Sequence, residues 1–279
     1  MGRAEKEAER AKRLAGQVAR IYAGILGANL TGVYMHGSLA LGGFHWATGD
    51  IDLLVVTYEQ PSDVQKEAMA RVLIDLWVAA PPKGFEMSVV LKRSCAAPRC
   101  PAPYEFHFSG MHLARAQSDL PAYCAGMHGL DPDLAAHFAV VRSAGLALCG
   151  ERVEDVFGEV PQKEYLSSVM SDLADAEGGM KAAPASYVLN LCRTLAYLRT
   201  GRMLSKEEGG RWALDAVDPK LCTAVRSALR SYTEGSAFQA QEQAVFQLCS
   251  FVMREMERHD SLAAVSYTHL RAHETEADL

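Results

Sequence analysis

The segment 33–57, VYMHGSLALGGFHWATGDIDLLVVT, constrains the fold of this chain more than any other part of the sequence. It begins as an apolar run, is interrupted by a Gly-Ser pair and a glycine-rich loop, and becomes apolar again over 51–57, as expected of a buried strand. Asp50 and Asp52 stand at the start of this second run. Because residues two apart on a strand project from the same face of a sheet, we expect both carboxylates together at the mouth of the strand.

A metal–triphosphate site accounts best for this pattern. Two adjacent carboxylates repel each other and are costly to bury unless a cation neutralises them, and oxygen ligands of this kind suit Mg²⁺ that bridges substrate phosphates. Gly37 and Ser38 end the first strand, where a backbone without a Cβ atom can approach a phosphate. An Asp-x-Asp or Gly-Ser pair alone is common in turns, so the prediction depends on the ordered combination.

The composition limits the possible partners and the compartment. The chain has 279 residues, of which 49% are hydrophobic and 22% charged, and its net charge is −6. A negative net charge argues against nonspecific nucleic-acid binding and is compatible with a cationic small-molecule substrate. The seven cysteines are scattered, and neither a secretory signal nor a long uncharged apolar run is present. We therefore expect a cytoplasmic monomer with reduced thiols and with no membrane or nucleic-acid partner.

The order of the periodic segments predicts an α+β protein with two domains. Strand patterns occur in the first half of the chain, including a short alternating segment at 103–109, whereas from Glu164 onward no strand pattern appears and helical patterns dominate. We expect a mixed sheet with flanking helices over 1–157 and an all-helical domain over 158–260, with helix starts at Ser62 and Ser205 and a helix end at Thr200-Gly201. The last helix is expected to end near 258–260. Residues 261–279 lack helical periodicity and are predicted to be a non-native or disordered tail.

Pattern alone does not decide between a structural and a functional role for four further residues. Glu86 opens the apolar strand FEMSVVL and is either an exposed edge residue or part of the site. His107, in the segment PYEFHFS, is expected in a loop or at the rim of the substrate pocket rather than as a metal ligand. Lys206 stands in the first turn of a helix, where a lysine is normally a solvated surface residue, and Tyr232 is compatible with a half-buried helix end.

The strand, Gly-Ser turn, glycine-rich loop and Asp-Ile-Asp strand resemble the signature of the DNA polymerase beta-like nucleotidyltransferase superfamily. More narrowly, roughly residues 15–258 resemble the spectinomycin/streptomycin adenylyltransferases, which inactivate aminoglycoside antibiotics; the T-G-x-x-x-x-K pattern at 200–206 supports this narrower match. The resemblance implies a nucleotidyltransferase domain over 1–157, a helical substrate- and nucleotide-binding domain over 158–260, ATP as co-substrate and Mg²⁺ as cofactor.

The resemblance also implies roles for individual residues. Asp50 and Asp52 would bind the metal, and Glu86 would complete the acidic triad as the general base that accepts a proton from the attacking hydroxyl. Lys206 would contact the nucleotide phosphates, as would Gly37 and Ser38, and Tyr232 would lie near the nucleotide.

The chain departs from the family pattern at three places. Gly49 replaces a family serine, so either Thr48 supplies the missing hydroxyl or one phosphate contact is lost. Met111 aligns with a substrate-contacting tryptophan of the streptomycin-modifying members. The acidic residue that these members carry before the helix at 186 is absent, or has moved to Asp172, Asp175 or Glu177. We therefore expect spectinomycin to be favoured over streptomycin.

The predicted function is transfer of AMP from ATP to a hydroxyl of an aminocyclitol antibiotic, which would confer resistance. Two alternatives stay open at this point. The first alternative is a nucleotidyltransferase that acts on a protein or RNA acceptor. The second is a non-catalytic, antitoxin-like binding module that keeps the fold without turnover. An intact set of carboxylates argues against the second alternative.

Overall fold

The computed structural model describes residues 2–174 and 176–276, and the chain divides into two compact units, Met1–Asp172 and Leu173–Leu279. The division lies inside helix α9 (Gln162–Ala174), further along the chain than the domain boundary expected after residue 157. Hydrogen bonds explain this position, because the first turns of α9 are tied to the N-terminal unit. The Ser168 hydroxyl accepts from the Ala136 N–H at 3.1 Å, and the Glu164 carboxylate accepts from the Cys100 N–H at 2.7 Å.

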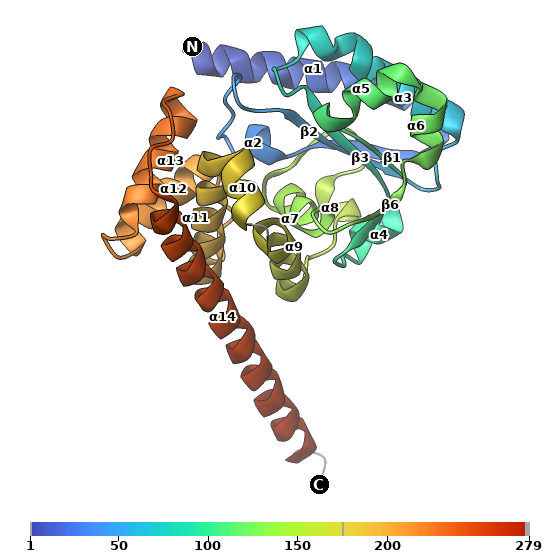
Figure 1. Cartoon of the computed structure of the whole chain (residues 1–279). Helices are drawn as coiled ribbons and strands as arrows, with labels where there is room; N and C mark the ends of the chain where they lie inside the picture. Colours follow the sequence, from blue (N-terminus) through green and yellow to red (C-terminus); the bar gives the residue numbers. More distant parts are fainter. Residues whose placement is uncertain (1, 175, 277–279) are drawn as a thin grey trace. The chain divides into compact units, whose positions relative to one another are not determined.

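A five-stranded mixed sheet forms the centre of the first unit (Figure 1). Its strands, in spatial order, are β5 (Phe106–Phe108), β3 (Phe85–Leu91), β2 (Ile51–Thr57), β1 (Leu30–Met35) and β7 (Leu146–Gly150). The β2–β3 pair is parallel and the other neighbouring pairs are antiparallel. A separate two-stranded ribbon joins β4 (Ala102–Tyr104) to β6 (Gly129–Asp131).

Helices cover both faces of this sheet, which explains why β2 and β3 read as continuous apolar runs. One face packs on α1 (Arg3–Leu26), α3 (Asp63–Leu76), α5 (Leu113–Ser118) and α6 (Leu120–Gly126), and the opposite face packs on α7 (Leu134–Ala144) and α8 (Val153–Val156) (Figure 1). Leu53 and Val55 enter the first core, whereas Leu54 and Val56 enter the second. Short helices α2 (Gly37–Ala40) and α4 (Lys92–Ala96) follow β1 and β3.

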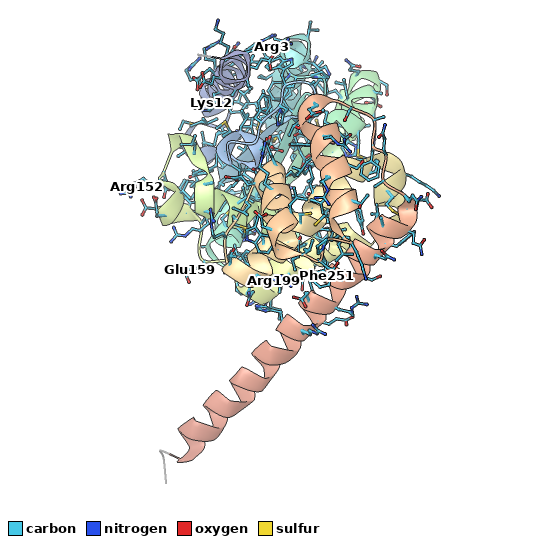
Figure 2. All side chains as sticks on the ribbon, turned by 90° about the vertical axis from the view of Figure 1, so that its left-hand side faces the viewer. Arg3, Lys12, Arg152, Glu159, Arg199 and Phe251 are labelled. Atoms are coloured by element: carbon cyan, nitrogen blue, oxygen red, sulfur yellow. The ribbon has the colours of Figure 1, made fainter. Side chains whose placement is uncertain are left out.

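Helix α1 is amphipathic, with one face packed on the sheet and the other exposed. Val18 and Tyr22 of α1 are fully buried against the sheet. Arg3 and Lys12 extend from the outer face of the same helix, where they pair with glutamates three or four residues away (Figure 2). Further along, the predicted start of α3 is confirmed, because the Ser62 hydroxyl accepts from the Gln65 N–H at 3.3 Å in a capping box.

The second unit is helical, as expected. It contains α10 (Ala176–Ala182), α11 (Pro184–Thr200), α12 (Lys206–Ala216), α13 (Cys222–Glu234) and α14 (Glu242–Glu276). Helix α11 packs against α12, α13 and α14, and most of its length is buried. Gly201 has φ +69° and ends α11 in the left-handed conformation, and Ser205 caps α12 through the Glu208 N–H, so both predicted signals are confirmed.

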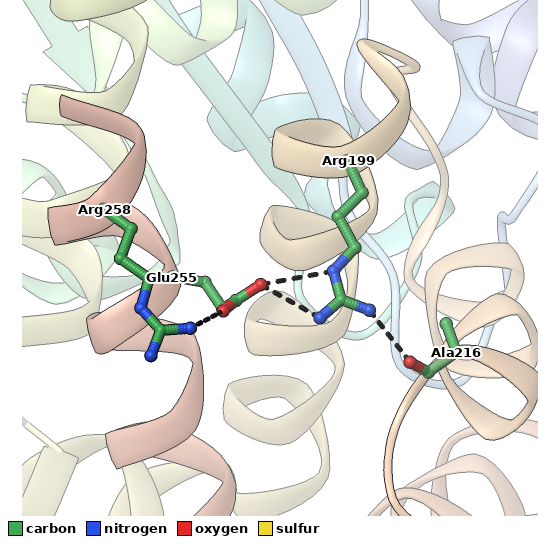
Figure 3. A network of polar contacts seen from close by, with 4 residues as sticks. All are labelled: Arg199, Ala216, Glu255 and Arg258. Carbon is green, nitrogen blue, oxygen red and sulfur yellow. Dashed lines mark hydrogen bonds and ion pairs between the residues drawn. The ribbon is translucent and has the colours of Figure 1, made fainter. Parts of the chain in front are cut away.

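A charged network holds three helices of this unit together (Figure 3). The Arg199 guanidinium of α11 contacts the Glu255 carboxylate of α14 at 2.9 Å and donates to the Ala216 carbonyl of α12 at 2.9 Å. Arg258 contacts the same carboxylate at 3.0 Å, and the Arg199 guanidinium also lies over the ring of Phe251 (Figure 2). These exposed hydrogen bonds join the C-terminal end of α11 to α12 and α14.

The expected end of the last helix is wrong. Helix α14 continues through Glu276, and Met256 is its last buried residue among those whose side chains the structure describes. The sequence of 261–276 contains no glycine or proline, so no backbone signal stops the helix near 258–260. Of the predicted tail, residues 277–279 lie outside the described residues. Among the helices that the structure describes, none combines the length and apolar character needed to cross a membrane.

Candidate active site

Three carboxylates meet at one end of the central sheet. Strands β2 and β3 are parallel and in register, so that Asp52 lies directly beside Glu86, and Asp50 lies two residues before Asp52. Side-chain oxygens of the three residues all lie within 4.8 Å of one another, and each residue is half-buried. The sequence placed Asp50 and Asp52 together through strand periodicity, whereas the proximity of Glu86 follows from the β2–β3 register.

The Gly-Ser turn after β1 lies directly against this carboxylate group. The His36 N–H donates to the Asp52 carbonyl at 3.1 Å, which fixes the turn to β2. Gly37 follows with φ +60°, and a Cβ atom at this position would coincide with an oxygen of the Asp52 carboxylate. Only glycine therefore permits this approach of the backbone to the site.

Two hydroxyls on the loop between β1 and β2 are buried without a partner. Within the described residues, the Ser38 Oγ and Thr48 Oγ1 atoms are inaccessible and make no hydrogen bond. Buried hydroxyls are normally satisfied, and these two stand close in sequence to the site, Ser38 directly after Gly37 and Thr48 two residues before Asp50, so a ligand with acceptor oxygens is a candidate partner for both. This arrangement fits a metal–phosphate group, because the carboxylates offer oxygen ligands for Mg²⁺ and the hydroxyls offer donors to phosphate oxygens.

Gly49 is confined by its surroundings. A Cβ atom there would lie 2.8 Å from the His45 carbonyl oxygen and 2.9 Å from the Phe44 ring. Phe44 is itself a buried core residue, so neither neighbour can easily move. A serine side chain therefore has no room at position 49, and the neighbouring residue Thr48 carries the hydroxyl of this loop.

Burial and repulsion shift the pKa of Glu86. Burial raises the pKa of this carboxyl to about 7, and the negative charge of Asp50 adds to the shift. The charges of Asp131, Asp133 and Asp172 act in the same direction. A carboxyl with a pKa near neutrality can accept a proton from a hydroxyl at physiological pH.

A second set of carboxylates acts electrostatically on Glu86. Asp131 ends β6, Asp133 precedes α7, and Asp172 lies on α9. The Asp131 carboxylate accepts from the Asp133 N–H at 2.8 Å. Burial, followed by the charge of Asp172, raises the pKa of Asp133 to about 6, although His137 opposes the shift. Sequence reasoning named Asp172 but missed the other two, because the segment Asp-Pro-Asp before a helix is typical of an ordinary helix start.

The other predicted site residues are divided between the two units. His107 is a half-buried residue of β5, and Met111 lies on a short 3-10 turn with 90% of its surface exposed. Lys206 is the first residue of α12 and Tyr232 lies in the last turn of α13, so both belong to the helical unit, where each is half-buried. Asp175 lies outside the described residues.

Known proteins resemble both units of the chain. Residues 155–256 match the family model described as the C-terminal domain of aminoglycoside adenylyltransferase. A spectinomycin 9-adenylyltransferase from Staphylococcus aureus is 23% identical over 223 residues, which cover 77% of this chain and 83% of that protein. An aminoglycoside (3'') (9) adenylyltransferase from Klebsiella pneumoniae is 23% identical over 211 residues, 73% of this chain and 78% of the other.

A solved structure has the same fold. The spectinomycin adenyltransferase AAD(9) from Enterococcus faecialis, crystallised with ATP and spectinomycin, superposes with a TM-score of 0.69 at 19% identity, over 88% of this chain and 99% of that chain. The fold class expected from the sequence, a nucleotidyltransferase domain followed by a helical domain, is thereby confirmed. The family model over residues 155–256, the sequence relatives and the shared fold all agree, and we conclude that the chain is similar to the aminoglycoside adenylyltransferases, as the sequence predicted.

Proposed function

We propose that this protein transfers AMP from ATP to a hydroxyl of an aminocyclitol antibiotic, with spectinomycin favoured over streptomycin, and so confers resistance. The observation that carries the proposal is the convergence of Asp50, Asp52 and Glu86 within 4.8 Å of one another beside the Gly37 turn. The names of its relatives support an adenylyl transfer, and two of the three proteins compared are named for spectinomycin.

Each residue of the site has a separate role in the proposed reaction. Asp50 and Asp52 would hold Mg²⁺, which when bound offsets the negative charge of the triphosphate. Ser38 and Thr48 donate hydrogen bonds to phosphate oxygens, and Gly37 keeps the backbone close to them. Glu86 accepts the proton of the substrate hydroxyl, whose oxygen attacks the α-phosphorus while pyrophosphate leaves. In the second unit, Lys206 and Tyr232 are the residues that we expect to contact the nucleotide. Most of the rate enhancement then comes from positioning and charge stabilisation.

The second carboxylate set supports a cationic acceptor. The negative charge of Asp172 raises the pKa of Asp133, and Asp131 adds a third like charge. An ammonium group placed among them relieves this repulsion, and aminocyclitol antibiotics carry such groups. An RNA acceptor would add negative charge to a protein whose net charge is already −6. The exposed Met111 side chain provides no aromatic surface, which is consistent with the expected preference against streptomycin.

A substrate panel tests the proposal. Purified protein is incubated with ATP and Mg²⁺ and with spectinomycin, streptomycin, a transfer RNA pool or a bacterial lysate as acceptor. We expect pyrophosphate release and a product one AMP heavier with spectinomycin. Pyrophosphate release only with the RNA or the lysate would show that the acceptor is not an antibiotic. No pyrophosphate release with any acceptor would support a binding module instead. Susceptibility of a sensitive bacterium that expresses the protein, measured for each drug separately, provides the matching cellular result.

The pKa of Glu86 predicts that Mg²⁺ stabilises the protein more at high pH. Because the pKa is raised from 4.5 to about 7 in the folded protein, the uncharged carboxyl favours folding at acidic pH, and this contribution is lost as the pH rises through about 7. The rise in Tm on adding Mg²⁺ should therefore be larger at pH 8 than at pH 5.5. Glu86→Gln serves as the control, since it should remove most of the difference. Equal Mg²⁺ effects at both pH values would contradict the prediction.

Removal of the Thr48 hydroxyl should weaken binding of Mg·ATP. A hydrogen bond to a charged group contributes about 1.5–3 kcal/mol, so Thr48→Val should raise the Kd roughly tenfold or more while preserving shape. Thr57→Val is a matched control, because the Thr57 hydroxyl is also buried without a partner in the described part of the chain but lies at the far end of β2. Calorimetric titration with a non-hydrolysable ATP analogue measures both. Equal increases of the Kd in the two variants would show that the Thr48 hydroxyl does not contact the nucleotide.

A further inference from the structure

A serine and a histidine lie beside the proposed general base on the same face of the sheet. Ser88 follows Glu86 by two residues on β3, so the two side chains project from the same face. His107 lies opposite Ser88 in the β3–β5 ladder, and the Ser88 Oγ and His107 Nδ1 atoms are 2.9 Å apart. Ser88 is only 4% exposed, which makes this hydrogen bond an internal one.

Several contacts hold the His107 ring in place. The Tyr123 hydroxyl donates to the His107 carbonyl oxygen, which fixes the backbone of β5. The ring packs edge-on against Tyr104 and His112, with centroids 6.1 and 5.6 Å away. With Nδ1 bound to Ser88, the imidazole has little freedom to rotate about its side-chain bonds.

The second ring nitrogen of His107 is available. Among the described residues, the Nε2 atom has no hydrogen-bond partner, and it does not belong to the buried unsatisfied atoms. The Nε2 atom of this half-buried residue is therefore accessible to a ligand. Burial, followed by the charge of His112, lowers the pKa of His107 to about 4, so the ring is neutral at physiological pH and offers one donor and one acceptor nitrogen.

The surroundings connect this ring with the candidate active site. The ring is bonded to Ser88, which lies two residues from Glu86 on the same face of β3, so the sheet register brings His107 to the neighbourhood of the proposed general base. The charge of Asp131 acts on the pKa of both Glu86 and His107. A neutral imidazole can bind a hydroxyl there without repelling a nearby ammonium group, whereas lysine or arginine would repel it. A small acceptor with several hydroxyls and a positive charge matches both features.

We propose that His107 binds a hydroxyl of the acceptor substrate through Nε2, and that Ser88 is the positioning residue that fixes the orientation and tautomer of its ring. The proposal rests on the proposed function for the nature of the acceptor. Neither residue is assigned to nucleotide binding, so the pair affects the acceptor step alone.

Kinetics of four variants test this assignment. Ser88→Ala and His107→Ala should each raise the acceptor KM about tenfold, as expected for loss of one positioned hydrogen bond, while the KM for Mg·ATP and the Tm change little. The double variant should be no worse than His107→Ala, because Ser88 acts through His107. His128→Gln, which alters an exposed histidine, is the control. Additive losses, or a parallel rise of the KM for Mg·ATP, would overturn the proposal.

A spectroscopic measurement separates this proposal from the proposed function. The ¹⁵N shifts of the His107 ring report its tautomer without any substrate. In the unaltered protein one tautomer should dominate, and Ser88→Ala should give a mixture. If no aminocyclitol is modified but the tautomer changes as expected, the proposed acceptor is wrong and the positioning role of Ser88 stands. An unchanged tautomer in Ser88→Ala would remove that role even if antibiotic transfer is confirmed.

Discussion

Asp52→Asn is expected to lower the rate of adenylyl transfer about a thousandfold while the protein stays folded. A metal ion contributes several kcal/mol of charge stabilisation, and about 1.4 kcal/mol corresponds to a factor of ten in rate, so loss of one of its ligands has an effect of this size. Asp52 is the central member of the group, since it lies beside Glu86 across the β2–β3 pair and two residues from Asp50. Asparagine has the same shape but is a much weaker ligand for Mg²⁺.

The fold should tolerate this change. The hydrogen bond that fixes the preceding turn uses the backbone carbonyl of Asp52, which asparagine keeps. Removal of one of three like charges also reduces repulsion in the protein without metal. Asp75→Asn is the matched control, because Asp75 is an exposed residue of α3 on the surface of the same unit. Pyrophosphate release and thermal denaturation are measured for both variants. More than a tenth of the original activity in Asp52→Asn would contradict the role of this carboxylate in metal binding.

The same variant distinguishes an enzyme from a binding module. If the biological effect of the protein is binding rather than turnover, a cell that expresses Asp52→Asn should keep that effect. For an antibiotic-modifying enzyme, the variant should lose resistance together with transfer activity. Susceptibility tests of cells with the original protein, Asp52→Asn and Asp75→Asn provide the comparison.

Gly37→Ala should have the second large effect, a loss of about a hundredfold or more in activity. The new Cβ atom would occupy the position of an Asp52 carboxylate oxygen, so the carboxylate or the turn must move. A displacement of about 1 Å in an active site can cost roughly a hundredfold in rate. The residue also has φ +60°, a conformation that costs about 1–2 kcal/mol for any residue with a Cβ atom.

Gly42→Ala provides a close control for this prediction. Gly42 lies on the same loop with φ +75°, but a Cβ atom there would meet no atom within 4 Å. Both variants carry the backbone penalty, and only Gly37→Ala disturbs the carboxylate. We therefore expect similar decreases in Tm that reflect the shared strain, with an additional loss of activity in Gly37→Ala alone. Equal activities in the two variants would show that the approach of Gly37 to Asp52 is unimportant.

Local patterns in the sequence were sufficient to predict much of this protein. The apolar run after Asp50 predicted a strand buried on both faces, and its period of two predicted that Asp50 and Asp52 lie together. The capping residues Ser62 and Ser205 predicted two helix starts. These features depend on residues within a few positions of one another, so the sequence by itself determined them.

Pairings between distant segments could be decided only by the tertiary structure. Ser88 meets His107 through the β3–β5 ladder, and the charge of Asp131 acts on the pKa of Glu86 from a distant part of the sequence; neither pairing has a local signal. The exclusion of a side chain at Gly49 depends on the Phe44 ring in the core. The physical reason is common to all three: strand register and core packing are set by the whole set of buried surfaces, which no short segment of sequence contains.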